Sequence, residues 1–326
     1  MIADEYQQFY RGVAQILEKS HFDLSTPLLG CGGCFDLVAK KQTILLLLKL
    51  VTNIDSFREE QAFELRKLAS MLDGFPLIIG KRIRSTTDIE NSIVYTRYQI
   101  PAVSLETLYN LLVNHLPPLI YAHRGGFKVK FDGHLLKEKR LEKNYSMGDF
   151  AREVGISKRA IYEYERSTVD VSLVTAMRIE ELLDEPLTLA INLFEGMKRI
   201  GSVTTPSSFS SVPKSDIERE VKKHFDAIGL KDQLWTKKLP IRVLAKTLIT
   251  QHEKDKIPTT ITGIAEESSK DDIAKKIQIT YSVSRVAEAD PLIIVGSETP
   301  KTNIDGVPIM SIDELIKKKK DKKSEN

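Results

Sequence analysis

The sequence predicts two α/β arms that flank a central all-α domain. Similar patterns recur near both ends of the 326-residue chain, residues from about 134 to 196 show only helical periodicity, and GSVTTPSSFSSVP from Gly201 has the composition of a linker. The predicted boundaries are an N-terminal α/β domain (the first arm) at 1–125, the central domain at 126–200, a linker at 201–213, and a C-terminal α/β domain with a basic tail (the second arm) at 214–326.

The composition is that of a globular chain, with 41% hydrophobic and 29% charged residues. The longest apolar run, TILLLLKLV from Thr43, contains Lys49 and is far too short to span a bilayer. The N-terminus carries acidic residues where a secretory signal would have a basic region and an apolar stretch, and the chain has only 2 cysteines. We therefore expect a cytoplasmic protein with no membrane partner.

The formal net charge of +3 is too small to identify a nucleic-acid partner, so the local arrangement of charge has to decide. The basic tail KKKKDKKSEN from Lys317 is predicted to be a solvated chain end. Nonspecific contact between this tail and an anionic polymer is the alternative.

Two segments at opposite ends of the chain share one pattern. They are FPLIIGKRIRSTTDIENSIVYTRYQIPAVSLETLYNLL from Phe75 and DPLIIVGSETPKTNIDGVPIMSIDELIKK from Asp290. Each predicts a strand, a polar loop, a short strand and a helix. Ser104 and Ser311 are predicted N-caps of these helices, and Glu314 completes a capping box with Ser311.

The similarity extends upstream of these segments. FDLVAKK and TILLLLKLV in the first arm correspond to IRVLAKT and TTITGIAEE in the second, and amphipathic helices precede and follow each pair. Both arms therefore predict the order helix, strand, strand, helix, strand, strand, helix over about 110 residues, which is an ordinary domain size. Duplication of one domain is the simpler account, and chance similarity between two α/β units is the alternative.

The central segment, read from His134, predicts a series of short helices. Leu135, Leu136 and Leu141 line one face of the first. Ser146 is the predicted N-cap of the second, SMGDFAREV, with Asp149 in its first turn, where a carboxylate is favourable. Gly155 ends that helix, because a glycine adopts the left-handed conformation readily.

The third central helix predicts a surface for a partner. Ser157 is its expected N-cap, Ile161 and Tyr164 are expected to be buried, and the second helix is expected to bury Phe150, Ala151 and Val154. Lys158, Arg159, Tyr162 and Glu163 then point outward. Two helices joined by a short turn, the second opening with cations, predict a helix-turn-helix whose second helix enters the DNA major groove.

This region resembles the lambda-repressor and Cro type of helix-turn-helix from Leu135 to Leu189, on the patterns AREVGIS and IYEYER. The resemblance implies five helices, the last two in SLVTAMRIEELL and PLTLAINLF. It also implies a structural pair between Arg140 and Glu165. Met147 departs from the family, which often has glutamine at that position to reach DNA.

The predicted DNA-binding residues share an expected position on the outer surface of this helix-turn-helix. They are Lys137, Ser146, Met147, Ser157, Lys158, Arg159, Tyr162 and Glu163. Arg159 or Lys158 would pair with guanine edges, and Ser146, Ser157 and Lys137 would contact phosphates. A helical protein-interaction module that does not bind DNA is the alternative.

The whole chain resembles an archaeal family of helix-turn-helix transcriptional regulators. That resemblance implies a sequence-specific DNA-binding regulator whose partner is double-stranded DNA. Because one such module reads only a few base pairs, we expect a homodimer that reads two half-sites. The sequence predicts no cofactor and leaves the effector ligand unknown. A nonenzymatic adaptor of the transcription or repair machinery is an alternative.

A DNA-processing function is a further alternative, because the first arm looks like the core of the PD-(D/E)xK nucleases. Asp36 and Lys49 occupy matching places, but Leu47 stands where the second acid should be, and Arg242 replaces Asp36 in the second arm. A site without that acid would lack charge to hold a metal ion. We therefore predict a protein that is not an enzyme, with arms that serve dimerisation, ligand sensing or shape-based DNA contact.

CGGC at Cys31 to Cys34 has the spacing of a metal or redox site. No further pair of ligands follows, and an apolar strand follows where a redox motif needs a helix. We predict a glycine turn with buried thiols and no metal, and zinc shared across a dimer is the alternative.

Overall fold

A computed structural model describes residues 2–28, 32–84, 86–194, 212–213, 215–236, 238–239, 241–246, 259–265, 270–296, 303–304, 306–312 and 314. The chain divides into two compact units. One contains residues 1–51, 55–78 and 199–326, and the other contains residues 52–54 and 79–198. Among the described residues, no helix has both the length and the apolar character that crossing a membrane requires.

The first arm is a mixed α/β fold. Its elements are α1 (Ile2–Lys19), β1 (Asp23–Leu24), β2 (Leu37–Lys41), β3 (Ile44–Asn53), η1 (Ile54–Ser56), α2 (Glu59–Met71), β4 (Phe75–Ile83), β5 (Thr87–Asp88), β6 (Ile93–Arg97), β7 (Ile100–Ser104) and α3 (Leu105–Leu112). The strand order is β1-β2-β3-β4-β7-β6, with β5 beside β4. β3 is almost continuously apolar and buried, as expected for a strand with both faces covered.

The second arm repeats this order. Its elements are α8 (Asp216–Ala227), β12 (Asp232–Trp235), β13 (Ile241–Lys246), β14 (Thr260–Ala265), α9 (Lys270–Ala287), β15 (Asp290–Val295), β16 (Asn303–Ile304) and β17 (Val307–Ser311). The strand order β12-β13-β14-β15-β17-β16 matches the first arm strand for strand. This shared strand order supports the duplication predicted from sequence. The first arm has three more strands than we expected, β1, β5 and β6, and the described part of the second arm has two more, β12 and β16.

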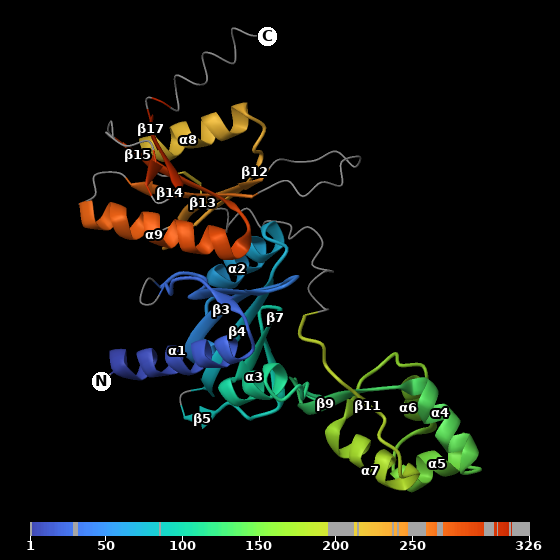
Figure 1. Ribbon diagram of the computed structural model, residues 1–326. Coiled ribbons are helices and arrows are strands. Elements are labelled where there is room, and N and C mark those ends of the chain that lie inside the picture. The colour runs from blue at the N-terminus through green and yellow to red at the C-terminus, as the bar shows by residue number, and fades with distance from the viewer. Residues whose placement is uncertain are drawn as a thin grey trace. The chain divides into compact units, whose positions relative to one another are not determined.

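The two helices of the second arm cover opposite faces of its sheet (Figure 1). On the α8 face, Val221 and Phe225 pack among residues such as Val243 and Ile264. On the α9 face, Ile277 packs against a separate cluster. Both sheet faces are therefore buried. The helix that we expected after Ser311, like the basic tail, lies mostly outside the described residues.

The predicted N-caps are confirmed in both arms. Ser104 Oγ accepts from Thr107 N at 3.0 Å, and Ser311 Oγ accepts from Glu314 N at 3.2 Å. Glu314 Oε2 in turn accepts from Ser311 N at 2.9 Å, which completes the capping box. These local rules held because they involve residues three positions apart.

A β-hairpin that begins within the predicted first arm leads into the four helices of the central domain (Figure 1). Its elements are β8 (Ile120–His123), β9 (Gly126–Phe131), α4 (Gly133–Glu142), α5 (Met147–Val154), α6 (Lys158–Glu165), β10 (Val171–Ser172), α7 (Leu173–Leu183) and β11 (Thr188–Leu189). β9 pairs with β8, β10 and β11 in antiparallel fashion. The helices enclose an apolar cluster that includes Leu136, Phe150, Ile161 and Ile179.

The prediction of a fifth central helix, which the sequence resemblance implied, is wrong. Residues 186–194 form no helix, and β11 pairs with β9 instead. The physical reason is a tertiary contact: Glu180 Oε1 accepts from Leu187 N and Thr188 N, each at 2.8 Å, and so holds the segment extended beside α7. Of the leucines that we expected to line the first central helix together, Leu136 is fully buried whereas Leu141 is 54% exposed.

Replacing Ile161 with alanine should lower the free energy of unfolding by about 2–5 kcal/mol, because the fully buried side chain leaves a cavity in the central cluster. Urea unfolding followed by circular dichroism measures this change. Val174→Ala is the matched control, since Val174 is 61% exposed and its loss should change stability by less than about 0.5 kcal/mol. Equal effects of the two substitutions would contradict the packing described.

Candidate nucleic-acid interface and nuclease-like site

The turn between α5 and α6 is built by three local devices. Ser146 Oγ accepts from Asp149 N at 3.1 Å and begins α5, and Ser157 Oγ accepts from Ala160 N at 3.1 Å and begins α6. Gly155 ends α5 with φ 78° and ψ 35°, a left-handed conformation that is unfavourable for residues other than glycine. The hydrogen bond from Ser146 lowers the pKa of Asp149, and the nearby Arg152 contributes to the shift.

Burial of one face of each helix decides what the other face exposes. Phe150, Ala151 and Val154 of α5 are buried as predicted, and so is Ile161 of α6, whereas Tyr164 is half-buried. Lys158 and Arg159 consequently lie exposed at the N-terminal end of α6. Two adjacent cations beside the free amides of a helix start form a surface suited to an anionic partner.

The structure brings the starts of α5 and α6 together. A Cβ added to Gly148 would lie 3.4 Å from Lys158 Cε and 3.8 Å from Ser146 Oγ, so the Lys158 side chain extends over the first turn of α5. Ser146 and Ser157 are exposed and Met147 is half-buried. Lys137 is exposed on α4.

Two of the predicted DNA-binding residues on α6 form hydrogen bonds with neighbours that we did not predict from the sequence. Tyr162, 45% exposed, accepts a hydrogen bond from Arg166 Nη1 at 2.6 Å, and the guanidinium lies 5.3 Å from its ring centroid. The carboxylate of Glu163 accepts from the Thr168 hydroxyl. The spacing of four residues between Tyr162 and Arg166 was the signal that could have identified that pair.

The orientation of α6 depends on a buried ion pair. Arg140 Nε of α4 lies 2.6 Å from Glu165 Oε1, both side chains are only 6% exposed, and Arg140 Nη1 donates to Tyr145 O at 2.7 Å. α4 approaches α6 so closely that a Cβ on Gly133 would lie 2.4 Å from Tyr164 O. This is the pair that the family resemblance implies as structural.

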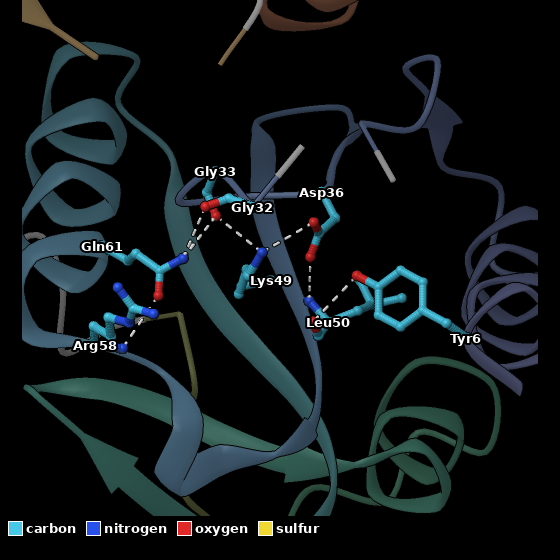
Figure 2. A network of polar contacts seen from close by, with 8 residues as sticks. All are labelled: Tyr6, Gly32, Gly33, Asp36, Lys49, Leu50, Arg58 and Gln61. Atoms are coloured by element: carbon cyan, nitrogen blue, oxygen red, sulfur yellow. Dashed lines mark hydrogen bonds and ion pairs between the residues drawn. The ribbon is translucent and has the colours of Figure 1, made fainter. Parts of the chain in front are cut away.

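The nuclease-like site of the first arm is a closed polar network (Figure 2). Lys49 Nζ donates to Asp36 Oδ1 at 3.0 Å and to Gly33 O at 2.9 Å. Asp36 Oδ2 accepts from Leu50 N at 2.7 Å, and Leu50 O accepts from Tyr6 OH at 3.2 Å.

A glutamine of α2 completes this network. Gln61 Nε2 donates to Gly32 O at 3.1 Å and Gly33 O at 3.2 Å, and Gln61 Oε1 accepts from Arg58 N at 3.2 Å (Figure 2). Gly33 O therefore receives two donors, one from β3 and one from α2. The turn before β2 is fixed to both elements.

Burial dominates the electrostatics of this network. It raises the pKa of Asp36, and the Lys49 charge, followed by the Leu50 amide, opposes that rise. Burial, with the nearby Asp36 charge, also raises the pKa of Tyr6. The Asp36 and Lys49 side chains are 2% and 9% exposed, so little of either is open to a substrate.

The residues of this site do not fit the divalent metal that a PD-(D/E)xK fold implies. Leu47 is fully buried where the second acid would stand, and Lys49 already contacts the Asp36 carboxylate. Within the described part of the chain, no three potential ligands among His, Cys, Asp and Glu come together for a metal ion. A single carboxylate neutralised by a lysine is a poor magnesium site.

The corresponding position of the second arm has the opposite charge. Arg242 Nε donates to Glu218 Oε1 of α8 at 2.9 Å, and Arg242 Nη1 donates to Thr236 O at 2.6 Å. The Glu218 side chain is 5% exposed. The acid of the first arm's pair lies just before a strand, whereas the acid of the second arm's pair lies on a helix, and the Arg242 side chain is 23% exposed.

The described residues of the CGGC turn pack against neighbouring side chains. Cys34 is free and buried, and burial raises its thiol pKa, whereas Cys31 lies outside the described residues. A Cβ added to Gly33 would lie 2.2 Å from Leu239 Cδ2, so the second glycine permits close approach of the second arm. The prediction of a buried thiol holds for Cys34.

Comparison with known families places two domains along the chain. Residues 6–118 match the PD-(D/E)XK superfamily domain, and residues 136–189 match the helix-turn-helix family. The chain is therefore a helix-turn-helix protein with a nuclease-like α/β domain ahead of the helix-turn-helix. No solved structure matches it.

Related proteins span most of the chain. A protein of Pyrococcus furiosus named "Putative HTH-type transcriptional regulatory protein" is 34% identical over 88% of this chain and 86% of its own length. A protein of Methanocaldococcus jannaschii with the same description is 34% identical over 93% and 90%, and one of Methanococcoides burtonii is 31% identical over 93% and 90%. The chain belongs to this archaeal family of HTH-type transcriptional regulatory proteins, as the sequence resemblance indicated.

Replacing Lys49 with methionine should lower the free energy of unfolding by about 3 kcal/mol, because it leaves the Asp36 carboxylate buried without its cation. Adding Asp36→Asn should recover at least about 1 kcal/mol, because the amide removes the unpaired charge and can still accept from Leu50 N. Urea unfolding of the wild type, Lys49→Met, Asp36→Asn and the double variant measures this coupling.

Arg11→Met is the control for that experiment, because Arg11 is exposed on α1 and its replacement should change stability by less than about 0.5 kcal/mol. Strictly additive effects of Lys49→Met and Asp36→Asn would contradict the buried pair.

Proposed function

We propose that this protein is a sequence-specific DNA-binding transcriptional regulator of the cytoplasm and that α5 and α6 contact double-stranded DNA. The observation that supports this most is the exposed pair Lys158 and Arg159 at the start of a helix whose opposite face is anchored by Ile161. A recognition helix needs this arrangement, with its N-terminal end free and its orientation fixed. The names of the archaeal relatives and the helix-turn-helix match support the same class.

The proposed contacts follow from residue chemistry. Arg159 or Lys158 donates to guanine O6 and N7, the most frequent specific contact in the major groove. Ser146, Ser157 and Lys137 position phosphates, and Met147, Tyr162 and Glu163 complete the surface. Arg166 acts as a positioning residue because it holds the Tyr162 ring. Arg140 and Glu165 have a structural role only.

We further propose that two copies of the chain act together and that the arms are not catalytic. One helix-turn-helix reads few base pairs, so a second copy supplies the other half-site. The closed Asp36–Lys49 pair and the buried Leu47 support arms without nuclease activity. We also propose the domain organisation expected from the sequence, with an N-terminal domain at 1–125, a central domain at 126–200, a linker at 201–213 and a C-terminal domain at 214–326.

Selection of bound fragments from the source genome tests the proposal. At about 0.15 M salt, the wild type should enrich a recurring two-fold symmetric site, and Arg159→Ala should weaken binding to it by about ten-fold or more, as expected for loss of a bidentate base contact. Arg124→Ala is the matched control, since Arg124 is an exposed arginine at the tip of the β8–β9 hairpin. Recovery of one unselective pool by wild type and Arg159→Ala would identify an interaction module instead.

Incubation of supercoiled plasmid with the protein and Mg²⁺ or Mn²⁺ should leave the DNA intact, because the described residues of the first arm do not bring together the carboxylates that would hold a catalytic metal. Agarose electrophoresis over hours measures this. Cleavage that disappears in Asp36→Asn would show that the arm is a nuclease, and cleavage unchanged by Asp36→Asn would indicate a contaminant.

A further inference from the structure

The two arms contact one another through equivalent elements. α2 of the first arm contacts β12 and β13 of the second, and α9 of the second arm contacts β2 of the first (Figure 1). In the repeat, α2 corresponds to α9, and β1 and β2 correspond to β12 and β13. The contact therefore runs in both directions between the same pair of surfaces, which is the property of a two-fold interface.

The residue correspondence comes from the sequence repeat and is supported by backbone detail. Alignment of the two Pro-Leu-Ile-Ile segments makes Asp73 equivalent to Glu288, and alignment of FDLVAKK with IRVLAKT makes Lys40 equivalent to Lys246. Asp73 and Glu288 both have φ 53°, although neither is glycine. The next residue donates back to the helix in each arm, from Gly74 N at 2.8 Å and from Ala289 N at 2.9 Å.

Two ion pairs across the contact are the same pair in opposite directions. Lys40 Nζ contacts the Glu288 carboxylate, and Lys246 Nζ lies 3.9 Å from Asp73 Oδ2. The lysine is on the second strand of one arm, and the acid follows the long helix of the other. Chance contact between unrelated surfaces would not be expected to reproduce both partners.

A second pair of contacts obeys the same relation. The shift that relates Asp73 to Glu288 also relates Lys67 to Ser282. Lys67 Nζ lies 2.6 Å from Asp232 Oδ1 of β12, and Ser282 Oγ accepts from Thr26 N, just after β1, at 2.6 Å. Equivalent helix positions thus contact the first strand region of the opposite arm.

The loops between the first two strands of each arm contact each other. Leu239 lies against Gly33, and Lys238 Cδ would be 3.7 Å from a Cβ on Gly32. Contact between equivalent loops is expected where a two-fold axis passes through an interface. Leu239 is 3% exposed, so this contact is buried. It covers the turn that contains Gly33, whose carbonyl oxygen accepts a hydrogen bond from Lys49.

We infer that the two arms form an internal dimer, in which the surface built by α2, β1 and β2 pairs with its own duplicate, built by α9, β12 and β13. The occupant of each surface is the other arm of the same chain. Joining the arms covalently raises their effective concentration and favours this pairing over pairing between copies. A second copy of the chain must then bind elsewhere, and this inference stands whether or not the protein binds DNA.

Zero-length carbodiimide cross-linking of the full chain tests the inference. The reagent joins a lysine to a carboxylate only at contact distance, and a mixture of ¹⁵N-labelled and unlabelled protein separates links within one chain from links between copies. We expect Lys40–Glu288, Lys246–Asp73 and Lys67–Asp232 links within single chains. The Lys139–Glu185 link in the central domain, at 3.6 Å, is the positive control.

Pairing of the first arm of one copy with the second arm of another would give the same three links, but between labelled and unlabelled chains. Two first arms facing each other would join Lys40 of one copy to Asp73 of the other. Either result, or the absence of all three expected links while Lys139–Glu185 forms, would overturn the inference. In the charge-swapped variant Lys40→Glu/Glu288→Lys the link between positions 40 and 288 should persist in similar yield, whereas Lys40→Glu alone should abolish it.

Discussion

The buried ion pair between Arg140 and Glu165 is the interaction on which the proposed DNA surface depends. It joins α4 to α6 at a place where both side chains are only 6% exposed, and a second Arg140 nitrogen holds the carbonyl of Tyr145. A charge at such a site is costly unless it is paired, so the two helices have one favourable relative orientation. That orientation buries Ile161 and leaves Lys158 and Arg159 exposed. The proposed DNA surface is thus a consequence of the packing beneath it.

The cost of an unpaired buried charge also explains why Asp36 and Lys49 of the nuclease-like arm contact each other and leave little of either side chain open to a substrate. Asp36 is buried before β2, and Lys49 on the next strand neutralises it, with Gly33 O as a second acceptor. Once a lysine supplies the compensating charge, the carboxylate needs no metal ion. In the second arm Arg242 stands at the position of Asp36 and pairs with Glu218 of α8 instead of with a residue of the next strand. Both arms therefore have a charge pair at this position, and neither arm brings together the carboxylates of a metal site among the described residues.

Much of this organisation could be predicted from the sequence, because its causes are local. Serine caps, the left-handed glycine at 155 and the apolar face of α6 involve residues within one or two turns, and the repeat is visible in the order of its motifs. The missing fifth helix could not be foreseen, since Glu180 holds Leu187 and Thr188 in an extended conformation. The two-residue strands β10 and β11 exist only because β9 lies beside them. The contacts between arms were equally hidden, because they join residues far apart in the chain.

Hydrogen–deuterium exchange of the full chain, with and without its selected DNA duplex, shows whether α5 and α6 form the DNA-binding surface. Amide exchange reports which segments lose access to solvent, independently of any substitution. We expect bound DNA to slow exchange in residues 146–163, which contain the starts of α5 and α6, and to leave exchange in the arms largely unchanged. Slowed exchange confined to the arms, with α5 and α6 unaffected, would contradict this expectation and move the DNA-binding surface to the duplicated domains.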